Sequence, residues 1–514
     1  MHAPSGRPQR PPAPPASLVR DLRRLLGDGG LLLDPTRLLA YESDGLCLVA
    51  EQASLVALPR DTAQAAETMR LLYSAGLPVV PRGAGTGLTG GAAPVAGGAV
   101  LSLARMRRIL FVDADDRYAR VEAGVVNAEL SKAVKPHGLY YAPDPSSQMA
   151  CTLGGNLANN SGGPHCFKHG NTGRHLLGAL WLEPDGTQLD LSGPRLDPEG
   201  LDLLGFMLGS EGTLGLATEL TLNLLPLPER VETLLGIFAD LASACQAVSD
   251  LIAAGLEPSA IEILDRLTIE AVEASVFRAG YPQHAGAVLL IECDGRAAEV
   301  QDLCAELERL LRSRGAFELR RAASESERKL LWAGRKGAFG AMGRIAPDLY
   351  VADAVVPRTR LAELVVFASE VCRERGLKLA NVFHAGDGNL HPNICYDRRD
   401  PAEVRRVLEA GDLILRKCLE FGGSLSGEHG IGIEKREHMC AAFRQADLDA
   451  MAAVRHAFDP ARRMNPGKLL PTRACLELRT AAPLTAAPHA AAPAAVPAAV
   501  DATAPAAAPR EERP

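Results

Sequence analysis

The chain has 514 residues, 47% of them hydrophobic, so it is long enough for a large core and for more than one domain. Its 55 Lys and Arg residues nearly balance 62 Asp and Glu residues, which gives a net charge of −7. The sequence has no basic stripe, and this argues against a nucleic acid partner. The 11 cysteines include no CxxC pair, which argues against a disulfide framework and against an iron–sulfur cluster held by this chain.

The two ends of the chain differ in composition from the rest. Residues 1–16 are Pro-rich and polar, without the apolar core of a signal peptide. Residues 476–514 are mostly Ala with recurring Pro, which breaks helices. We expect both ends to be disordered, and we expect no direct membrane span because no apolar run is long enough. We expect a cytoplasmic location, with a transit peptide as the alternative because Arg residues occur and acids are lacking before Asp21.

Apolar periodicity predicts an α+β protein. Short Val- and Leu-rich runs separated by Gly predict strands before about residue 225, and from 229 onward strands alternate with helices. We therefore expect one domain at 17–228, an α+β domain at 229–425, and a C-terminal loop with helices at 426–475. The predicted strands are 77–81, 99–103, 119–125, 177–184 and 287–295, and the predicted helices are 17–39, 241–255, 296–315, 401–421 and 434–458.

The first domain contains three glycine-rich loops, at 78–91, 142–163 and 208–222. The first holds a formal GxGxxG match, but Gly and Pro follow where a dinucleotide-binding helix should begin, which disfavours a Rossmann site. Successive exposed backbone N–H groups still form a nest for anions such as a pyrophosphate. One such loop could be an ordinary tight turn, whereas three together predict a long, anionic, partly flat ligand.

These three loops, in this order, resemble the FAD-binding domain of the vanillyl-alcohol oxidase / p-cresol methylhydroxylase superfamily. The resemblance implies that the first loop wraps the FAD pyrophosphate and that the later loops line the flavin and adenine. Some members attach FAD through a His of the first loop, and Thr86 stands there in this chain, which implies non-covalent FAD. The candidate FAD-binding residues are Pro81, Arg82, Gly83, Ala84, Gly85, Thr86, Gly87, Leu88, Gly90, Pro143, Ser146, Ser147, Gly154, Gly155, Asn156, Asn160, Gly162, Gly163, Glu211, Gly212 and Gly215.

Three residues of the C-terminal half predict a metal site, and a fourth predicts a base beside it. Asp387-Gly388 favours a two-residue hairpin turn that would set His384 directly opposite His391, with Cβ atoms about 4.5–5.5 Å apart. The alternative is a cross-strand pair of histidines that bind no metal. On the glycine-rich loop 422–432, Glu428 would complete a catalytic zinc-type site with an open position, and His429 would be a candidate base.

The C-terminal half resembles the FAD-linked oxidase C-terminal domain found in glycolate oxidase, D-lactate dehydrogenase and D-2-hydroxyglutarate dehydrogenase. The resemblance covers residues 20–475 and implies that a divalent metal, zinc in some members, binds His384, His391 and Glu428. It assigns proton abstraction to His429. It also matches Arg335, in WAGRKGAF, to the residue that binds the substrate carboxylate, although Arg335 alone would be taken for a solvated helix charge.

The resemblance implies FAD-dependent oxidation of a small 2-hydroxy acid to the 2-oxo acid. Within the family, three motifs resemble the glycolate oxidase branch and favour it: YAPDPSSQMACTLGGN, LLWAGRKGAFGAMGRIAPDLY and SGEHGIGIEKREHMC. Enzymes for 2-hydroxyglutarate place a Lys near the position of Val351, so its absence favours glycolate, with D-lactate as the alternative. The implied partners are an iron–sulfur subunit and a second FAD-domain subunit, which could hold the chain at the inner face of a membrane. A metal hydrolase and a non-catalytic flavin-fold subunit are alternatives of other classes.

Overall fold

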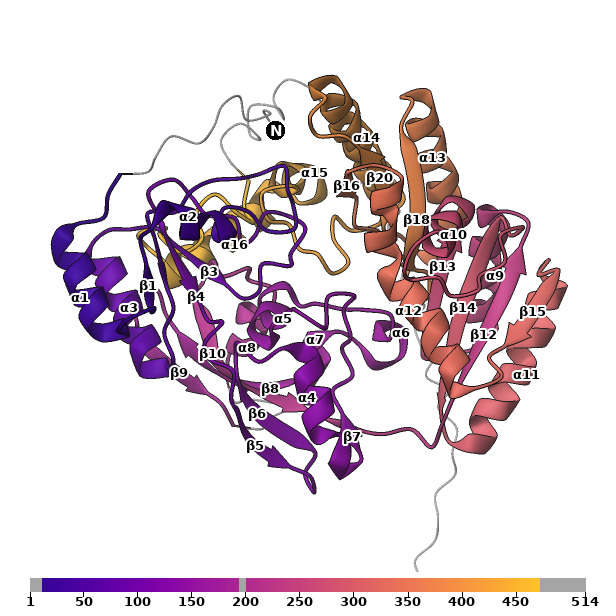
Figure 1. Ribbon diagram of the computed structural model, residues 1–514, viewed down its shortest axis with the longest axis horizontal. Coiled ribbons are helices and arrows are strands. Elements are labelled where there is room, and N and C mark those ends of the chain that lie inside the picture. The colour runs from indigo at the N-terminus through magenta and orange to yellow at the C-terminus, as the bar shows by residue number, and fades with distance from the viewer. Residues whose placement is uncertain (1–11, 194–199, 472–514) are drawn as a thin grey trace, which may run out of the picture.

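The computed structural model describes residues 12–193 and 200–471. The predicted disordered arm therefore lies mostly outside the described residues, and the Ala/Pro-rich tail at 476–514 lies entirely outside them. No helix in the described part of the chain is both long and apolar enough to cross a bilayer. The described residues form two α+β parts joined near residue 229, with the C-terminal segment returning to the first part (Figure 1).

The first part opens with α1 (Ala16–Leu26), which buries Leu18, Leu22 and Leu26 at a helical spacing of four residues. The predicted helix at 17–39 is too long, because Gly27 and Gly29 both adopt positive φ and end it. The other helices here are α2 (Pro35–Leu38), α3 (Thr62–Ser74), α4 (Asn127–Val134), α5 (Leu153–Asn159), α6 (Cys166–His169), α7 (Thr172–His175) and α8 (Leu203–Met207).

Two sheets share the core of this part. One has the order β1-β2-β4-β3, and the other is antiparallel with the order β5-β6-β10-β8-β9; β7 and β11 form a separate pair. Leucine, valine and alanine side chains from both sheets pack into one cluster with Trp181. The strands are β1 (Leu31–Leu32), β2 (Leu55–Ala57), β3 (Val79–Arg82), β4 (Ala99–Ser102), β5 (Ile109–Asp113), β6 (Tyr118–Glu122), β7 (Leu139–Tyr140), β8 (Leu176–Leu182), β9 (Gln188–Leu191), β10 (Leu216–Asn223) and β11 (Leu225–Pro226).

The second part is an antiparallel sheet with the order β15-β12-β14-β13-β18-β19-β17, which β20 and β16 extend beside β18. Helices α9, α11 and α13 pack on one face, and α10 and α12 on the other. The elements are β12 (Arg230–Phe238), α9 (Leu241–Ala253), β13 (Ala260–Asp265), α10 (Arg266–Glu273), β14 (Ala287–Gly295), α11 (Ala297–Ser313), β15 (Glu318–Arg321), α12 (Glu325–Ala341), β16 (Asp348–Val351), β17 (Ala354–Val355), α13 (Leu361–Glu374), β18 (Lys378–His384), β19 (Asn389–Leu390), β20 (Pro392–Tyr396) and α14 (Pro401–Glu420).

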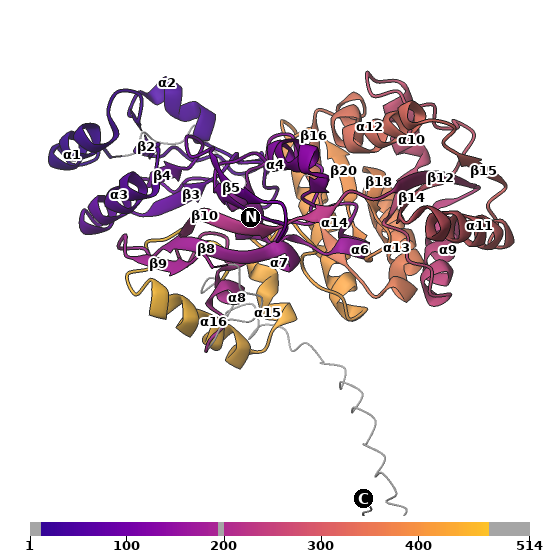
Figure 2. The same ribbon diagram turned by 90° about the horizontal axis from the view of Figure 1, so that it is seen from below.

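The C-terminal segment leaves the second part and docks on the first. The predicted helix at 434–458 is divided into the short α15 (Met439–Ala442) and α16 (Gln445–Phe458). Val454 and Phe458 of α16 pack on the core of the first part, and Met464 bridges to Val79 of β3. Figure 2 shows α15 and α16 beneath the sheet that holds β8 and β9. The segment thereby carries the loop at 421–435 across the junction of the two parts.

Candidate functional site

A cavity of about 630 Å³ lies between the two parts. One wall consists of the three glycine-rich loops, and 16 of the 21 expected FAD-binding residues line it. The sixteen are Pro81, Arg82, Gly83, Ala84, Gly85, Thr86, Gly87, Leu88, Ser146, Ser147, Gly154, Gly155, Asn156, Glu211, Gly212 and Gly215. The facing wall, from the second part and the C-terminal loop, includes Arg335, Lys336, Val351, Val382, His391, Asn393, Glu428 and His429.

The first loop leaves β3 and turns back within a few residues. Gly85 has a φ of +74°, and a Cβ there would collide with the Arg82 guanidinium, so a side chain would displace the arginine. Arg82 is itself buried and donates from Nη1 to the carbonyl of Ala92, which holds the two arms of the loop together. The backbone is thereby exposed to the cavity in the way that a bound anion requires.

Five expected residues, Gly90, Pro143, Asn160, Gly162 and Gly163, do not line the cavity. Two of them shape its surroundings: a Cβ on Gly162 would lie 2.9 Å from a Glu428 carboxylate oxygen, and Asn160 accepts a hydrogen bond from the Gly173 N–H. Glu211 does line the cavity, but its carboxylate accepts hydrogen bonds from the backbone N–H groups of Ile431 (2.6 Å) and Gly432 (2.8 Å). It therefore ties the third glycine-rich loop to the C-terminal loop.

The predicted register of the histidine hairpin is wrong. The turn spans four residues, 385–388, and His384 pairs with Asn389, while Asn381 pairs with Pro392. His391 consequently falls opposite Val382, two residues from the predicted partner. Because side chains alternate between the faces of a sheet, a shift of two residues leaves both histidines on one face. Their rings are diagonal neighbours, with centroids 5.1 Å apart.

The rings of His384 and His391 converge on one carboxylate oxygen of Glu428. Glu428 Oε1 lies 3.2 Å from His384 Nε2 and 3.2 Å from His391 Nε2. His384 does not line the cavity and lies beside Glu428, whereas His391 and Glu428 face the cavity. The ligand atoms of all three lie within 4.8 Å of one another.

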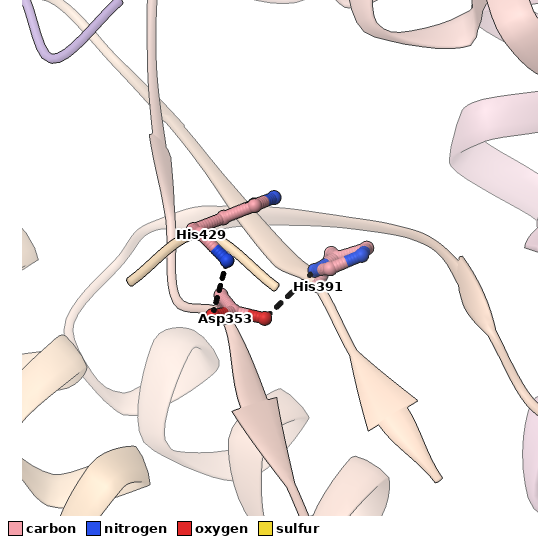
Figure 3. A group of neighbouring side chains, drawn as sticks. All are labelled: Asp353, His391 and His429. Carbon is pink, nitrogen blue, oxygen red and sulfur yellow. Dashed lines mark hydrogen bonds and ion pairs between the residues drawn. The ribbon is translucent and has the colours of Figure 1, made fainter. Parts of the chain in front are cut away.

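A buried aspartate anchors the loop that carries Glu428 and His429. Asp353, which lies between β16 and β17, accepts hydrogen bonds from Ser426 Oγ (2.6 Å), from the backbone N–H of Gly427 and from that of His429 (3.2 Å). Lys435 Nζ lies 3.0 Å from the same carboxylate. Figure 3 shows Asp353 beneath the imidazoles of His391 and His429, which stack with centroids 4.8 Å apart.

The carboxylates control the charge of the histidine cluster. Burial alone would lower the pKa of His384, but Glu262 and Glu428 outweigh it and hold that pKa well above its usual range. Burial would raise the pKa of Glu428, yet His384 and His391 hold it well below its usual range. Glu428 is thus an anion beside two imidazoles, which is the charge state of a metal-binding carboxylate.

His429 has the opposite environment. Burial lowers its pKa to about 4, although Asp353 opposes the shift. Its ring is therefore neutral near pH 7, and Nδ1 is buried without a hydrogen-bond partner among the described residues. Its carbonyl accepts hydrogen bonds from Asn159 Nδ2 (2.8 Å) and Thr89 Oγ1, both in the first part. His429 is a neutral, fixed imidazole that can accept a proton.

Arg335 lies on α12 with only 4% of its surface exposed, and it is no solvated helix charge. Its Nε and one Nη each lie 2.5 Å from Oε2 of Glu262 on β13. Glu262 is fully buried, and its other oxygen lies 2.6 Å from His384 Nδ1. Because a guanidinium has five N–H donors, Arg335 keeps donors for an anion in the cavity that it lines.

Comparison with known proteins identifies two family domains and related enzymes. Residues 227–469 match the model for the FAD-linked oxidase C-terminal domain, and residues 53–192 match that for an FAD-binding domain. The chain is 45% identical to glycolate oxidase subunit GlcD of Escherichia coli K12 over 89% of this chain and 91% of that protein. It is 32% identical to a D-lactate dehydrogenase of Anaerostipes hadrus over 79% of this chain and 87% of that one.

The chain belongs to the FAD-linked oxidase family. It is an FAD-dependent oxidoreductase, as the sequence predicted. A solved structure of p-cresol methylhydroxylase superposes with a TM-score of 0.74 at 16% identity, covering 88% of this chain and 96% of that one. This likeness confirms the predicted α+β fold class, with its FAD-binding domain of the p-cresol methylhydroxylase type.

The residues of this FAD-linked oxidase fit both expected groups. The glycine-rich wall offers backbone N–H groups to a pyrophosphate, and a Cβ on Gly83 would collide with the Thr152 hydroxyl, so the loops are built for close approach. His391 is buried with neither ring nitrogen in a hydrogen bond among the described residues. Two imidazoles with a carboxylate are the donors that suit a divalent cation such as zinc.

A second histidine group, Asp353, His391 and His429, has the same compactness but does not fit a metal as well. Asp353 is already paired with Lys435 and accepts the hydrogen bonds of the loop, so few of its lone pairs remain. The set His384, His391 and Glu428 is therefore the better metal site of the two.

Sequence reasoning missed Glu262, Asp353 and Lys435. Glu262 lies within the apolar run AIEIL, and Asp353 within VADAVV. A single acid in an otherwise buried strand is the only signal that either residue gives, because acids are rarely buried unless paired. Neither has a motif or spacing that would have shown its partner.

Proposed function

We propose that this chain is the FAD-bearing catalytic subunit of a glycolate oxidase, oxidising glycolate, and D-lactate as a second substrate, to the 2-oxo acid. The observation that carries the proposal is that Arg335, His391, Glu428 and His429 face the glycine-rich wall across one cavity. The 45% identity to a glycolate oxidase subunit supports the substrate class.

Arg335 binds the substrate carboxylate with the N–H donors that Glu262 does not use. Lys336 also lines the cavity, but its Nζ is 3.0 Å from Asp144, which neutralises it. Val351 and Val382 give the cavity an apolar border. This border suits the hydrogen of glycolate or the methyl of D-lactate, and a methyl discriminates between such acids by only about 1–3 kcal/mol.

His429 is the base that receives the hydroxyl proton of the substrate. Its depressed pKa keeps the ring neutral, and its stacking on His391 fixes its plane. His384, His391 and Glu428 would hold a divalent metal such as zinc, whose chemistry at this place is the polarisation of the substrate hydroxyl. FAD, non-covalently bound on the glycine-rich wall, supplies the hydride acceptor.

We also propose the partners. The E. coli relative is called a subunit, and this chain has no CxxC pair that could hold a cluster. An iron–sulfur subunit and a second FAD-domain subunit would then carry electrons onward, with the chain cytoplasmic or at the inner face of the membrane through them. The domain limits expected from the sequence, 17–228, 229–425 and 426–475, remain the proposed functional units.

Steady-state kinetics with glycolate, D-lactate and D-2-hydroxyglutarate test the proposal. We expect glycolate and D-lactate to reduce the flavin, with the dicarboxylate much poorer. A colourless protein that cannot be reconstituted with FAD would favour the metal hydrolase. A yellow protein without turnover on any 2-hydroxy acid would favour the non-catalytic flavin-fold subunit.

A further inference from the structure

One buried carboxylate touches two separate parts of the candidate site. Glu262 lies on β13, directly across from His384 on β18, and has no exposed surface. Its Oε1 lies 2.6 Å from His384 Nδ1, and its Oε2 lies 2.5 Å from both Nε and Nη2 of Arg335. A buried carboxylate persists only when it is paired, so this geometry is held by all three side chains together.

We infer that Glu262 is a positioning residue that links the metal ligand His384 to the substrate-binding Arg335; the inference rests on the proposed function. The carboxylate has no proton to donate, so His384 donates its Nδ1 hydrogen to Glu262. Nε2, which lies 3.2 Å from Glu428 Oε1, is then the nitrogen that would bind a metal, releasing its own hydrogen as the metal enters. Glu262 thereby selects the tautomer that can bind a metal.

The same carboxylate fixes the direction of Arg335. Holding Nε and Nη2 on one side leaves the remaining N–H donors of the guanidinium for the cavity. A substrate carboxylate on Arg335 and a metal on His384 would therefore be aligned through one side chain. Loss of Glu262 should disturb metal binding and substrate binding together, although Glu262 neither lines the cavity nor belongs to the candidate metal ligands.

Glu292 provides a matched control. It is a buried glutamate on the neighbouring strand β14, and it too bridges a histidine and an arginine, His165 (3.0 Å) and Arg328 (3.2 Å). None of these three residues lines the cavity. Glu292→Gln therefore measures the general effect of neutralising a buried glutamate that bridges two basic side chains.

The experiment compares Glu262→Gln with Glu292→Gln in the flavin-loaded protein. An amide has one acceptor, so it cannot satisfy both His384 and Arg335. We expect the zinc affinity of Glu262→Gln, measured by competition with a chromophoric chelator, to fall by about 10–100-fold. We expect KM for glycolate to rise by about tenfold or more, with flavin absorbance unchanged. Glu292→Gln should keep the zinc affinity of the wild type.

Three results would overturn the inference: wild-type zinc affinity in Glu262→Gln, an equal loss of zinc affinity in Glu292→Gln, or a wild type that binds no zinc. If Glu262→Gln does not fold, Glu262→Asp retains the charge and shortens the reach, and it must still weaken zinc binding. A wild type that binds zinc but oxidises no 2-hydroxy acid would reject the proposed function and leave the link between Glu262 and the metal site standing.

Discussion

Asp353 and Lys435 form an ion pair in which neither side chain has any exposed surface. The pair lies under the loop that carries Glu428 and His429, and Lys435 Nζ also donates to the Asp353 carbonyl at 2.8 Å. Since burial would raise the pKa of Asp353, the lysine and the two nearby histidines are what hold that pKa well below its usual range. The pair is a structural support for the site.

Lys435→Met should destabilise the protein by about 3–5 kcal/mol, because it leaves the Asp353 charge buried without its partner. Urea unfolding followed by circular dichroism measures the loss. The control is Lys329→Met, which removes an exposed pair with Glu325 and should leave the midpoint nearly unchanged. Equal midpoints for the two variants would show that the buried pair contributes little.

His165 gives the junction of the two parts a pH dependence. It lies 3.0 Å from Asp144 of the first part and 3.0 Å from Glu292 of the second, with Lys336 and Arg328 paired to the same carboxylates. Burial alone would lower the pKa of His165, but the two carboxylates raise it to about 10. The protonated ring therefore holds the two parts together near neutral pH.

Because the pKa of His165 is raised in the folded protein, its protonation stabilises the fold fully at pH values below its pKa in the unfolded chain, about 6.5. This contribution is lost as the pH rises toward 10. We therefore expect wild type to exceed His165→Gln in urea midpoint at pH 6, and the difference to shrink steadily up to pH 10. Unfolding curves at pH 6, 8 and 10 measure this trend. A difference that stays constant across the range would mean that His165 is neutral in the folded protein.

The metal ligands and the flavin wall belong to different parts of the chain, so they should be separable by mutation. Even the outer partners of metal ligands contribute about 10–100-fold, so His384→Ala and His391→Ala should each lower kcat/KM by more than about 100-fold. Flavin absorbance should remain. His284→Ala, on an exposed histidine, is the control. Parallel loss of flavin and activity would argue against separate sites, as would elemental analysis that finds no metal in active enzyme.

Much of the site could be predicted from sequence because its signals are local. Glycine density located the cavity wall, and strand alternation placed His384 and His391 on one face even though their register was wrong by two residues. Glu262 and Asp353 could not be found this way. Their partners lie up to 122 residues away in the chain, and only the packing of separate strands and loops brings them together.

Thr86 lines the cavity where some members of the superfamily attach the flavin through a His. A threonine hydroxyl is a poor nucleophile without an adjacent base. We therefore expect purified protein to be yellow and to release its flavin into the supernatant on acid precipitation. Flavin that stays with the precipitated protein would refute non-covalent binding.

Val351 places an uncharged side chain on the cavity wall opposite the glycine-rich loops. It ends β16, pairs with Asn393 of β20 and faces the cavity, whereas its neighbour Tyr350 packs into a core on the other face. Of the two lysine and arginine side chains that the described residues of the second part place on the cavity wall, Lys336 is held by Asp144, and Arg335 would already bind the first substrate carboxylate. A second substrate carboxylate would enter without a partner, which is unfavourable by several kcal/mol.

We therefore expect glycolate and D-lactate to be far better substrates than D-2-hydroxyglutarate. Val351→Lys should raise the ratio of kcat/KM for D-2-hydroxyglutarate to that for glycolate by about tenfold or more, because a charge-assisted hydrogen bond contributes about 1.5–3 kcal/mol. Val351→Met has a similar length without the charge and should not raise the ratio. A wild type that prefers D-2-hydroxyglutarate, or an equal gain in Val351→Met, would show that charge at this position does not select the substrate.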